Sequence, residues 1–461
     1  MKLQIKNLGA VANGSIDLGK KFNLLCGPNG TGKTYFAYVI YGLLRNMLHV
    51  KGDVDLADSL IASRMIDVSI DREKLLKYRD SMRDTLIKNL DELFGIGEME
   101  RENLFPDFVL DYEDDSEEFI QQIIAGEMDL TETINSVKVR MVKPSGSELV
   151  HLSIENEDIP ASAITDLRLM LQTVLYYNLT LSPIRSVVMF PVERNSIYTF
   201  SKELSIRKQE AMDSIQMIVD KDRKFDKFDI LFTSKRYPLP IKDGLVVADD
   251  LLERKKYKSE FYEFAEQIEN ELLHGKVQIS NDGDIQFKPS KSPRKLLPIQ
   301  MTASIIKTLS SLVVYLKHIA RKNDLIIIDE PEINLHPDNQ IVLTQLLARL
   351  VNKGFRLLVS THSDYIVREI NNLVMLSHEN NELIMRIAKE KKYTPDMFIH
   401  KEDLSVHFFD YKNKSSKSVE VVSVPVDEAG FEVVSIDKVI ESQSDLSERL
   451  FYVLNYLSDG E

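Results

Sequence analysis

A glycine-rich segment near the start of the sequence has the residue types that hold the phosphates of a nucleotide. Residues 27–34 read GPNGTGKT, which fits the pattern G-x-x-x-x-G-K-[ST]. Glycines let backbone N–H groups turn inward, and the N-terminus of a following helix adds the positive end of its dipole. We predict that Lys33 reaches the β- and γ-phosphates of ATP and that Thr34 holds Mg²⁺. The predicted nucleotide-binding residues are Asn29, Gly30, Thr31, Gly32, Lys33 and Thr34.

Two adjacent carboxylates lie far along the chain, at the end of an apolar run. Residues 325–328 read LIII and are followed by Asp329 and Glu330. Such a run is typical of a parallel strand buried on both faces, and its carboxyl end faces the ligand crevice of an α/β sheet. We predict that Asp329 binds Mg²⁺ and that Glu330 polarises the attacking water, because alternate residues of a strand diverge.

A histidine follows a third apolar segment. Residues 355–361 predict another buried strand, and His362 comes directly after it. A neutral imidazole at this place can contact a γ-phosphate, so His362 is predicted to be catalytic. Glu193 and Arg194 follow a further apolar strand at 186–190. They fit two interpretations, as residues near the nucleotide or an interface and as an ordinary ion pair.

The surrounding elements must bring these residues together. Residues 22–26 predict a strand before the glycine loop, and residues 35–47 have helical spacing after it. Residues 1–18 indicate two strands with a turn at Asn13 and Gly14, and Asp282–Gly283 marks a hairpin turn. A strand pair is predicted around residues 144–146. The 296 positions between Lys33 and Asp329 indicate insertions between two halves of one nucleotide domain.

Composition limits the class of protein. The 461 residues are 43% hydrophobic, which is ordinary for a globular protein of two or three domains. No run approaches the roughly 20 apolar residues of a membrane span, and the N-terminus lacks a signal-peptide core. The single cysteine, Cys26, suits a reducing compartment, so we expect a cytoplasmic protein. The net charge of −14 means that DNA contact would need a local patch, such as residues 287–295, FKPSKSPRK.

The three motifs resemble those of the ABC-type ATPases of the SMC, RecF and OLD group. GPNGTGKT, LIIIDEPEINLHPDNQ and STHSDYIV are similar to the group's Walker A motif, its Walker B motif with the D-loop, and its switch-histidine segment. The resemblance implies an α/β, ABC-type P-loop ATPase with a mixed sheet core and a largely helical insertion. It also implies that ATP is bound between two chains of a homodimer or higher oligomer and is hydrolysed.

The group carries a signature helix that contacts ATP bound to a second subunit. The equivalent here is residues 296–316, where Thr302, Ala303 and Ser304 stand at the places of the group's Ser and Gly. Ser304 is therefore expected to contact the partner's nucleotide. Because the signature Gly is absent, we expect slow turnover. The alternative is a buried helix that Ser and Thr merely cap.

Several distinguishing features of the group are not found in this sequence. There is no pattern for long coiled-coil arms, and no D-x-D pair follows His362 as in the TOPRIM domain of OLD nucleases. The remaining organisation resembles the ATPase subunits of bacterial anti-phage systems of the Septu and PARIS types. This resemblance implies an ATP-driven oligomer that controls a separate effector nuclease.

The resemblance also suggests a division of the chain. Residues 1–49 and 285–375 are expected to form the ATPase domain, with residues 50–284 inserted between them. Residues 376–461 are expected to be a docking region that ends in a strand and an amphipathic helix from residue 432 onward. Two other functions stay open, a RecF-like DNA-binding ATPase in repair or replication and a self-contained nuclease that uses Asp427, Glu428 and Asp437.

Overall fold

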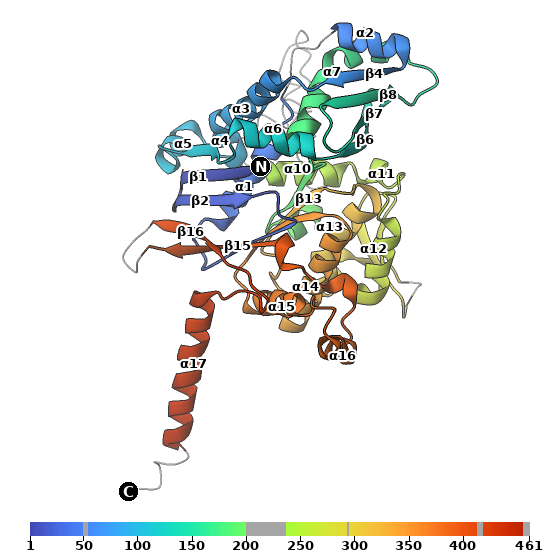
Figure 1. The fold of residues 1–461 in the computed structure, drawn as a ribbon. Coiled ribbons are helices and arrows are strands. Elements are labelled where there is room, and N and C mark those ends of the chain that lie inside the picture. The colour runs from blue at the N-terminus through green and yellow to red at the C-terminus, as the bar shows by residue number, and fades with distance from the viewer. Residues whose placement is uncertain (49–53, 200–236, 293–294, 413–417, 455–461) are drawn as a thin grey trace, which may run out of the picture.

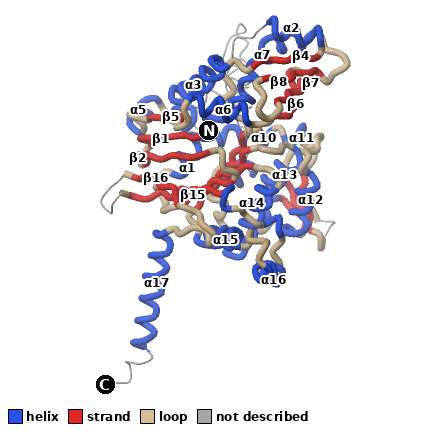
Figure 2. The backbone as a smooth tube through the Cα atoms, viewed as in Figure 1, coloured by secondary structure: helices blue, strands red, loops and turns tan. Residues whose placement is uncertain are grey.

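The computed structural model describes residues 1–48, 54–199, 237–292, 295–412 and 418–454. Its centre is a nine-stranded sheet in the order β5-β1-β2-β16-β15-β3-β14-β13-β9 (Figure 1). Helices surround this sheet (Figure 2), and strands and helices are interspersed along the chain, so the predicted α/β fold class is confirmed. The strands are β1 (Lys2–Leu8), β2 (Val11–Asp17), β3 (Phe22–Cys26), β5 (Val109–Tyr112), β9 (Val187–Phe190), β13 (Leu325–Asp329), β14 (Arg356–Thr361), β15 (Leu404–Tyr411) and β16 (Val419–Val424).

The half of the sheet that carries the predicted site is parallel. β15, β3, β14, β13 and β9 run in one direction, and their register places Cys26 beside Thr361 and Asp329 beside Ser360. β3 and β13 are buried along their whole length, as expected of strands covered on both faces. The carboxyl ends of these strands therefore meet at one edge, while the pairs β1–β2, β1–β5 and β15–β16 are antiparallel and make the sheet mixed.

Two hydrophobic clusters cover the two faces of this sheet. Successive strand residues point to opposite faces, so Leu25 belongs to one cluster and Leu24 to the other. The first cluster takes side chains from α1 (Lys33–Arg45), α3 (Arg72–Lys88) and α7 (Ala161–Leu181). The second takes them from α12 (Tyr262–Ile268), α13 (Ser304–His318), α14 (Pro337–Asn352) and α15 (Asp364–Met375).

The segment between the two halves of the predicted site adds helices and a four-stranded antiparallel sheet in the order β4-β8-β7-β6. Its β7–β8 pair confirms the strand pair predicted around residues 144–146. β5 and β9 also come from this segment, yet they pair within the central sheet. The elements are β4 (Met65–Ser69), β6 (Met128–Ile134), β7 (Val137–Lys143), β8 (Leu149–Ile154), α2 (Val54–Ser63), α4 (Leu90–Phe94), α5 (Glu98–Leu104), α6 (Ser116–Ala125), α10 (Leu239–Asp249) and α11 (Leu251–Arg254).

A small three-stranded sheet precedes α13. It contains β10 (Gly275–Ile279), β11 (Ile285–Pro289) and β12 (Leu297–Pro298). The predicted hairpin at Asp282–Gly283 is confirmed, since β10 and β11 pair antiparallel and Gly283 has a φ of 88°. Four short turns complete this half of the chain, the π-helical η1 (Glu269–Leu273) and the 3₁₀ turns η2 (Ile299–Met301), η3 (Pro395–Met397) and η4 (Lys401–Asp403).

The turn predicted at Asn13 and Gly14 is wrong. Both residues lie inside β2, and the chain reverses at residues 9–10 instead. A Cβ on Gly14 would lie 2.7 Å from the Cβ of Val421 in the neighbouring β16. The glycine therefore serves a close approach between strands, which is its other common use within a sheet.

The C-terminal segment enters the core. β15 and β16 lie between β2 and β3, so residues 376–461 supply central strands, and their role in docking stays a prediction. After α16 (Glu382–Glu390), the helix α17 (Val434–Tyr452) extends away from the body (Figure 1), without the strand predicted before it. Side chains of α17 are described from residue 443 onward, and Leu446, Leu450 and Phe451 are exposed.

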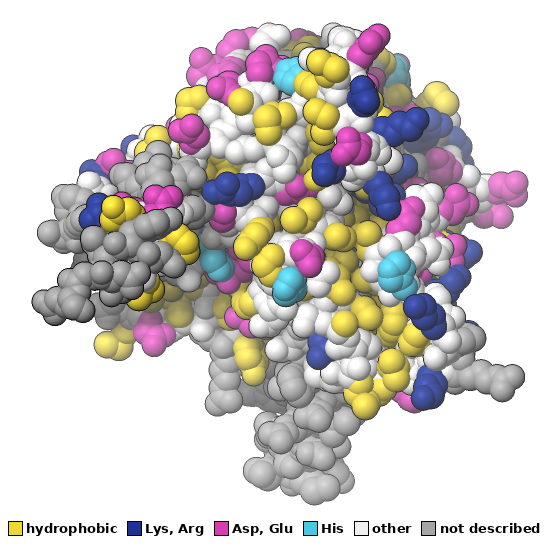
Figure 3. All heavy atoms as spheres, turned by 90° about the horizontal axis from the view of Figure 1, so that it is seen from below, with side chains coloured by type: hydrophobic (Ala, Val, Ile, Leu, Met, Phe, Trp, Pro, Cys, Tyr) yellow, Lys and Arg dark blue, Asp and Glu magenta, His cyan; other side chains and the backbone are white. Residues whose placement is uncertain are grey.

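No helix within the described ranges is long and apolar enough to cross a membrane. Seen from below, apolar and charged side chains alternate over one face of the molecule (Figure 3).

Candidate functional site

The glycine loop has backbone conformations that only glycine adopts easily. Gly27, Gly30 and Gly32 have φ values of 139°, 76° and 91°. A Cβ on Gly27 would lie 2.3 Å from the carbonyl oxygen of Phe409, and one on Gly32 would lie 2.7 Å from Val11. The loop is thus packed against β15 and β2 while its N–H groups remain free to turn toward a ligand. The structure places the loop between β3 and α1, as the sequence predicts.

Lys33 begins α1 and is turned back into the loop. Its Nζ donates to the carbonyl oxygens of Gly27 (2.8 Å) and Pro28 (2.7 Å), and the Thr31 hydroxyl also donates to Pro28 (2.8 Å). Burial lowers the pKa of Lys33, and the carboxylates of Glu330 and Asp329 oppose that shift. The predicted phosphate ligand and the two predicted carboxylates therefore lie at one site. Asn29 and Gly30 are exposed at the loop tip.

Asp329 ends β13 and is 1% exposed. Its Oδ1 accepts a hydrogen bond from the Ser360 hydroxyl, whereas Oδ2 is buried without a hydrogen-bond partner. Burial raises the pKa of Asp329, and hydrogen bonds from Ser360 and Thr34 oppose the shift. The two predicted magnesium ligands, Thr34 and Asp329, therefore lie near each other although 295 residues separate them.

Glu330 has a conformation that is uncommon for a residue with a side chain. Its φ is 44°, in the left-handed region. Its backbone N–H lies 3.1 Å from the carbonyl oxygen and 3.2 Å from the hydroxyl of Ser360. The side chain is 26% exposed, with Oε1 3.8 Å from Nδ1 of His362. The predicted catalytic residues Glu330 and His362 are therefore neighbours across β13 and β14.

The sequence interpretation missed Glu332, which holds the loop of His362. Glu332 Oε1 accepts hydrogen bonds from the Thr361 hydroxyl (2.6 Å) and the His362 backbone N–H (2.9 Å). It also lies 3.5 Å from Nδ1 of His362. The other oxygen, Oε2, is buried without a hydrogen-bond partner. The signal was present in the sequence, since a second glutamate follows two positions after Glu330.

Within the described residues, the contacts of Arg194 are not those of an ordinary ion pair. It is 2% exposed, and no residue of the described chain forms a salt bridge with it. Its guanidinium donates to backbone carbonyl oxygens, those of Asp329 (2.8 Å) and Glu330 (2.9 Å) among them. Burial lowers the pKa of Arg194 to about 10, which leaves it charged at neutral pH. The interpretation as a residue near the site is the one that the contacts favour.

Within one chain, Ser304 makes no polar contact that joins it to the predicted nucleotide-binding residues 27–34 in the described structure. It begins α13 and is exposed, and no hydrogen bond in the described structure joins it to residues 27–34. The hydroxyl of Thr302 donates to Ile299 (2.6 Å), and no side chain caps the helix. The capping alternative is therefore not supported. Of the basic segment before α13, Lys288, Lys291 and Lys295 are described, whereas Arg294 lies outside the described residues.

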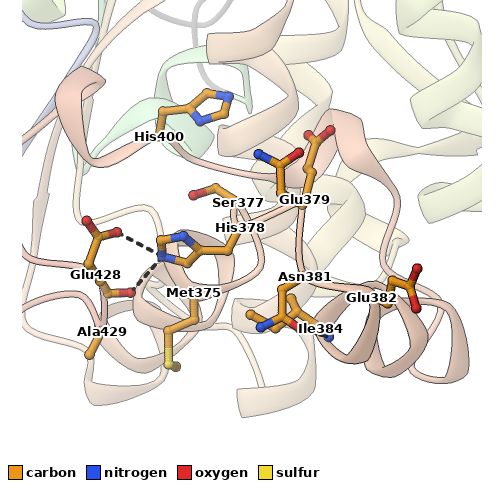
Figure 4. A pocket seen from close by; sticks show the side chains of 11 residues that line it. Met375, Ser377, His378, Glu379, Asn381, Glu382, Ile384, His400, Glu428 and Ala429 are labelled. Carbon is orange, nitrogen blue, oxygen red and sulfur yellow. Dashed lines mark hydrogen bonds and ion pairs between the residues drawn. The ribbon is translucent and has the colours of Figure 1, made fainter.

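The tail carboxylates proposed for a nuclease do not form a cluster where the structure describes them. Glu428 pairs with Lys401 and with His378 at 2.9 Å, and the Asp427 carboxylate accepts from the N–H of Ala429. The side chain of Asp437 lies outside the described residues. Glu428 and His378 line a cleft of about 1130 Å³ (Figure 4), which contains none of the residues predicted to bind or hydrolyse ATP.

The residues at the edge of the sheet fit a bound Mg²⁺. Mg²⁺ prefers oxygen ligands and takes one or two carboxylates together with phosphate oxygens. Asp329 offers a buried carboxylate oxygen with no hydrogen-bond partner. Thr34 interacts with the same carboxyl group. Thr34 and Asp329 would hold the ion, and Lys33 would meet the phosphates.

The chain has relatives among solved structures and protein families. It is similar to an SMC head structure bound to the C-winged helix domain of ScpA, with 12% identity, coverage of 93% of this chain and 98% of that chain, and a TM-score of 0.35. An SMC head with an extended coiled coil, bound to the C-terminal domain of ScpA and derived from Pyrococcus furiosus, has 13% identity, coverage of 97% and 98%, and a TM-score of 0.33. The SMC head domain from Thermotoga maritima has 11% identity, coverage of 92% and 98%, and a TM-score of 0.32. Similarity at this level establishes neither a shared site nor a shared function. No curated protein matches the chain. A family model described as an AAA ATPase domain matches residues 1–367, and the chain therefore belongs to the AAA ATPase domain family.

Proposed function

We propose that this protein binds ATP with Mg²⁺ and hydrolyses it at the carboxyl edge of the parallel strands. The observation that carries the proposal is the meeting of Thr34 with Asp329, beside Lys33, Glu330 and His362. A glycine loop, a lysine, a metal-binding pair and a glutamate at one edge are the parts that phosphoryl transfer to water requires.

Each residue has a role that follows from its place. Binding of phosphates replaces the two carbonyl contacts of Lys33, because an anionic oxygen is a stronger partner for an ammonium. Glu330 is partly exposed and accepts a proton from the attacking water, while His362 orients that water or the γ-phosphate. Mg²⁺, when bound, would neutralise charge that develops on the phosphate oxygens. Buried Asp329 would hold the ion in place.

We also propose that two chains enclose the nucleotide. Ser304 is exposed at the start of a helix without a side-chain cap, and Leu296 and Met301, which precede it in the chain, are also exposed. A polar group beside apolar side chains suits a contact with a second chain. The resemblance to ABC-type ATPases supplies the arrangement, in which Ser304 of one chain meets ATP held by Lys33 of the other.

The ATP-driven oligomer would control a separate effector nuclease in anti-phage defence. Within the described residues no cluster of three or more metal-binding side chains exists, so a nuclease centre in this chain finds no support there. α17 offers exposed apolar side chains to a partner, with Leu446 and Leu450 one turn apart. A closed state that encloses ATP gives the nucleotide the differential affinity that a switch needs.

The test compares wild type with Glu330→Gln and with Glu382→Gln, an exposed glutamate in α16 that serves as the control. Phosphate release is followed with ATP and Mg²⁺, and native mass spectrometry reports the assembly state. We expect Glu330→Gln to bind ATP, to lose turnover and to accumulate as an ATP-bound dimer, while the control behaves as wild type. Wild-type turnover in Glu330→Gln would contradict the assigned role of Glu330.

The same variant identifies the partner. Glu330→Gln is tagged, expressed in its native host and recovered with ATP and Mg²⁺. Stoichiometric recovery of a nuclease supports effector control. Recovery with DNA and replication proteins, together with salt-dependent duplex binding, would instead support a RecF-like DNA-binding ATPase.

A further inference from the structure

Arg194 reaches the site from a strand that carries none of the predicted site residues. β9 is the outer neighbour of β13, with Phe190 beside Ile328. The chain turns after β9 and brings Arg194 over the carboxyl end of β13, where it is 2% exposed. A guanidinium is therefore buried next to the carboxylate pair although its segment lies 135 residues before Asp329.

The guanidinium of Arg194 donates hydrogen bonds to backbone carbonyl oxygens. Nη1 donates to the carbonyls of Pro191 (3.1 Å) and Asp329 (2.8 Å), and Nη2 donates to the carbonyl of Glu330 (2.9 Å). Burying a charged side chain is unfavourable unless its donors are satisfied. The rigid fork of arginine spans two successive carbonyls, which the single ammonium of a lysine cannot do in the same geometry.

The contacts fix a conformation that Glu330 would not keep by itself. A φ of 44° is disfavoured for a residue with a Cβ and persists only where neighbours impose it. Ser360 holds the N–H of Glu330, and Arg194 holds its carbonyl. Both peptide planes around Glu330 are thus held, which sets the direction of its side chain toward the site.

We propose that Arg194 is a positioning residue for hydrolysis, which fixes the backbone of Asp329 and Glu330 so that the glutamate side chain meets the attacking water. The proposal rests on the function proposed above. Arg194 acts through Glu330 and not through contact with the nucleotide. Its loss should therefore slow the chemical step and leave ATP binding nearly unchanged.

The test uses Arg194→Lys, Arg194→Ala and a matched control. Arg356→Lys is the control, because Arg356 also donates to backbone carbonyls, those of Leu18, Gly19 and Lys20, but at the opposite end of β14. Turnover, the Kd of a non-hydrolysable ATP analogue and the melting temperature are measured for each. We expect kcat of Arg194→Lys to fall about 100-fold, as small misplacements of catalytic groups do. Its Kd should change less than about 3-fold, and Arg356→Lys should retain kcat.

A second measurement separates positioning from general destabilisation. Guanidinium ion at low millimolar concentration should restore part of kcat to Arg194→Ala and none to Glu330→Gln. Wild-type kcat in Arg194→Lys would overturn the inference and leave the ATPase function standing. A parallel fall of kcat, analogue affinity and melting temperature, without rescue, would reduce Arg194 to a structural role. Absence of hydrolysis in wild type would remove the proposed function and this inference together.

Discussion

His407 provides a pH-dependent test of how a buried ring in the central sheet affects the stability of the fold. It lies on β15, 2% exposed, beside β3, which leads into the loop. Nε2 is 3.1 Å from the Ser405 hydroxyl and 3.4 Å from Oδ1 of Asn23, whereas Nδ1 is buried without a hydrogen-bond partner. Burial lowers the pKa of His407 from 6.5 to about 4, and Asp17 opposes the shift only partly.

The sign of the effect follows from that direction. Below pH 6.5 the unfolded chain takes up a proton that the folded ring refuses, so stability falls as pH drops and levels off below about pH 4. The full loss from this group is about 3 kcal/mol, since a tenfold change in proton affinity corresponds to about 1.4 kcal/mol. Roughly 2 kcal/mol of it should be lost between pH 7.5 and pH 5 by the same linkage.

The assay is urea unfolding followed by circular dichroism at several pH values between 5 and 7.5. His407→Leu removes the titrating ring and should flatten the dependence by about 2 kcal/mol relative to wild type. His336→Gln is the control, because the His336 side chain is 71% exposed. An identical pH dependence in wild type and His407→Leu would refute the reasoning, since the buried ring would then contribute nothing to linkage.

Three further predictions concern the site itself. Lys33→Ala should weaken ATP binding about 10- to 100-fold in calorimetry, because a charged hydrogen bond contributes about 1.5–3 kcal/mol; unchanged affinity would remove Lys33 from the phosphate site. Glu332→Gln should keep ATP affinity and reduce kcat about 10-fold, since an uncharged amide holds the loop of His362 less strongly; a kcat equal to that of the control Glu382→Gln would exclude this role. Ser360→Ala should raise the Mg²⁺ concentration needed for half-maximal turnover, more so at low pH, because the lost hydroxyl opposes the upward pKa shift of Asp329; a pH-independent Mg²⁺ requirement equal to wild type would contradict it.

Local patterns were sufficient for the pieces of the site that are contiguous in the chain. The glycine loop needs a strand before it and a helix after it, and each has a signal of its own in residues 22–47. The buried strand before Asp329 was readable for the same reason, because four apolar residues in a row have few other uses. The α/β fold class followed from these pieces.

Two local predictions were wrong, the turn at Asn13 and Gly14 and the strand before α17. An Asn-Gly pair favours a turn, but at Gly14 the glycine admits the side chain of Val421 from β16. β16 comes from the far end of the chain, so nothing near Gly14 in the sequence could indicate it. The strand predicted from residue 432 is also absent, because the helix α17 begins at Val434.

The sequence by itself determined which residues could hold phosphate, metal and water, because loop glycines, Lys33, Thr34 and the Asp329–Glu330 pair are defined by residue type and local spacing. Only the tertiary structure decided how those residues are held. β9 beside β13 brings Arg194 to the carbonyls of the carboxylate pair, and Glu332 folds back onto the loop of His362. The physical reason is that strand order and register are set by packing of the whole core, so contacts between distant segments leave no local periodicity from which to predict them.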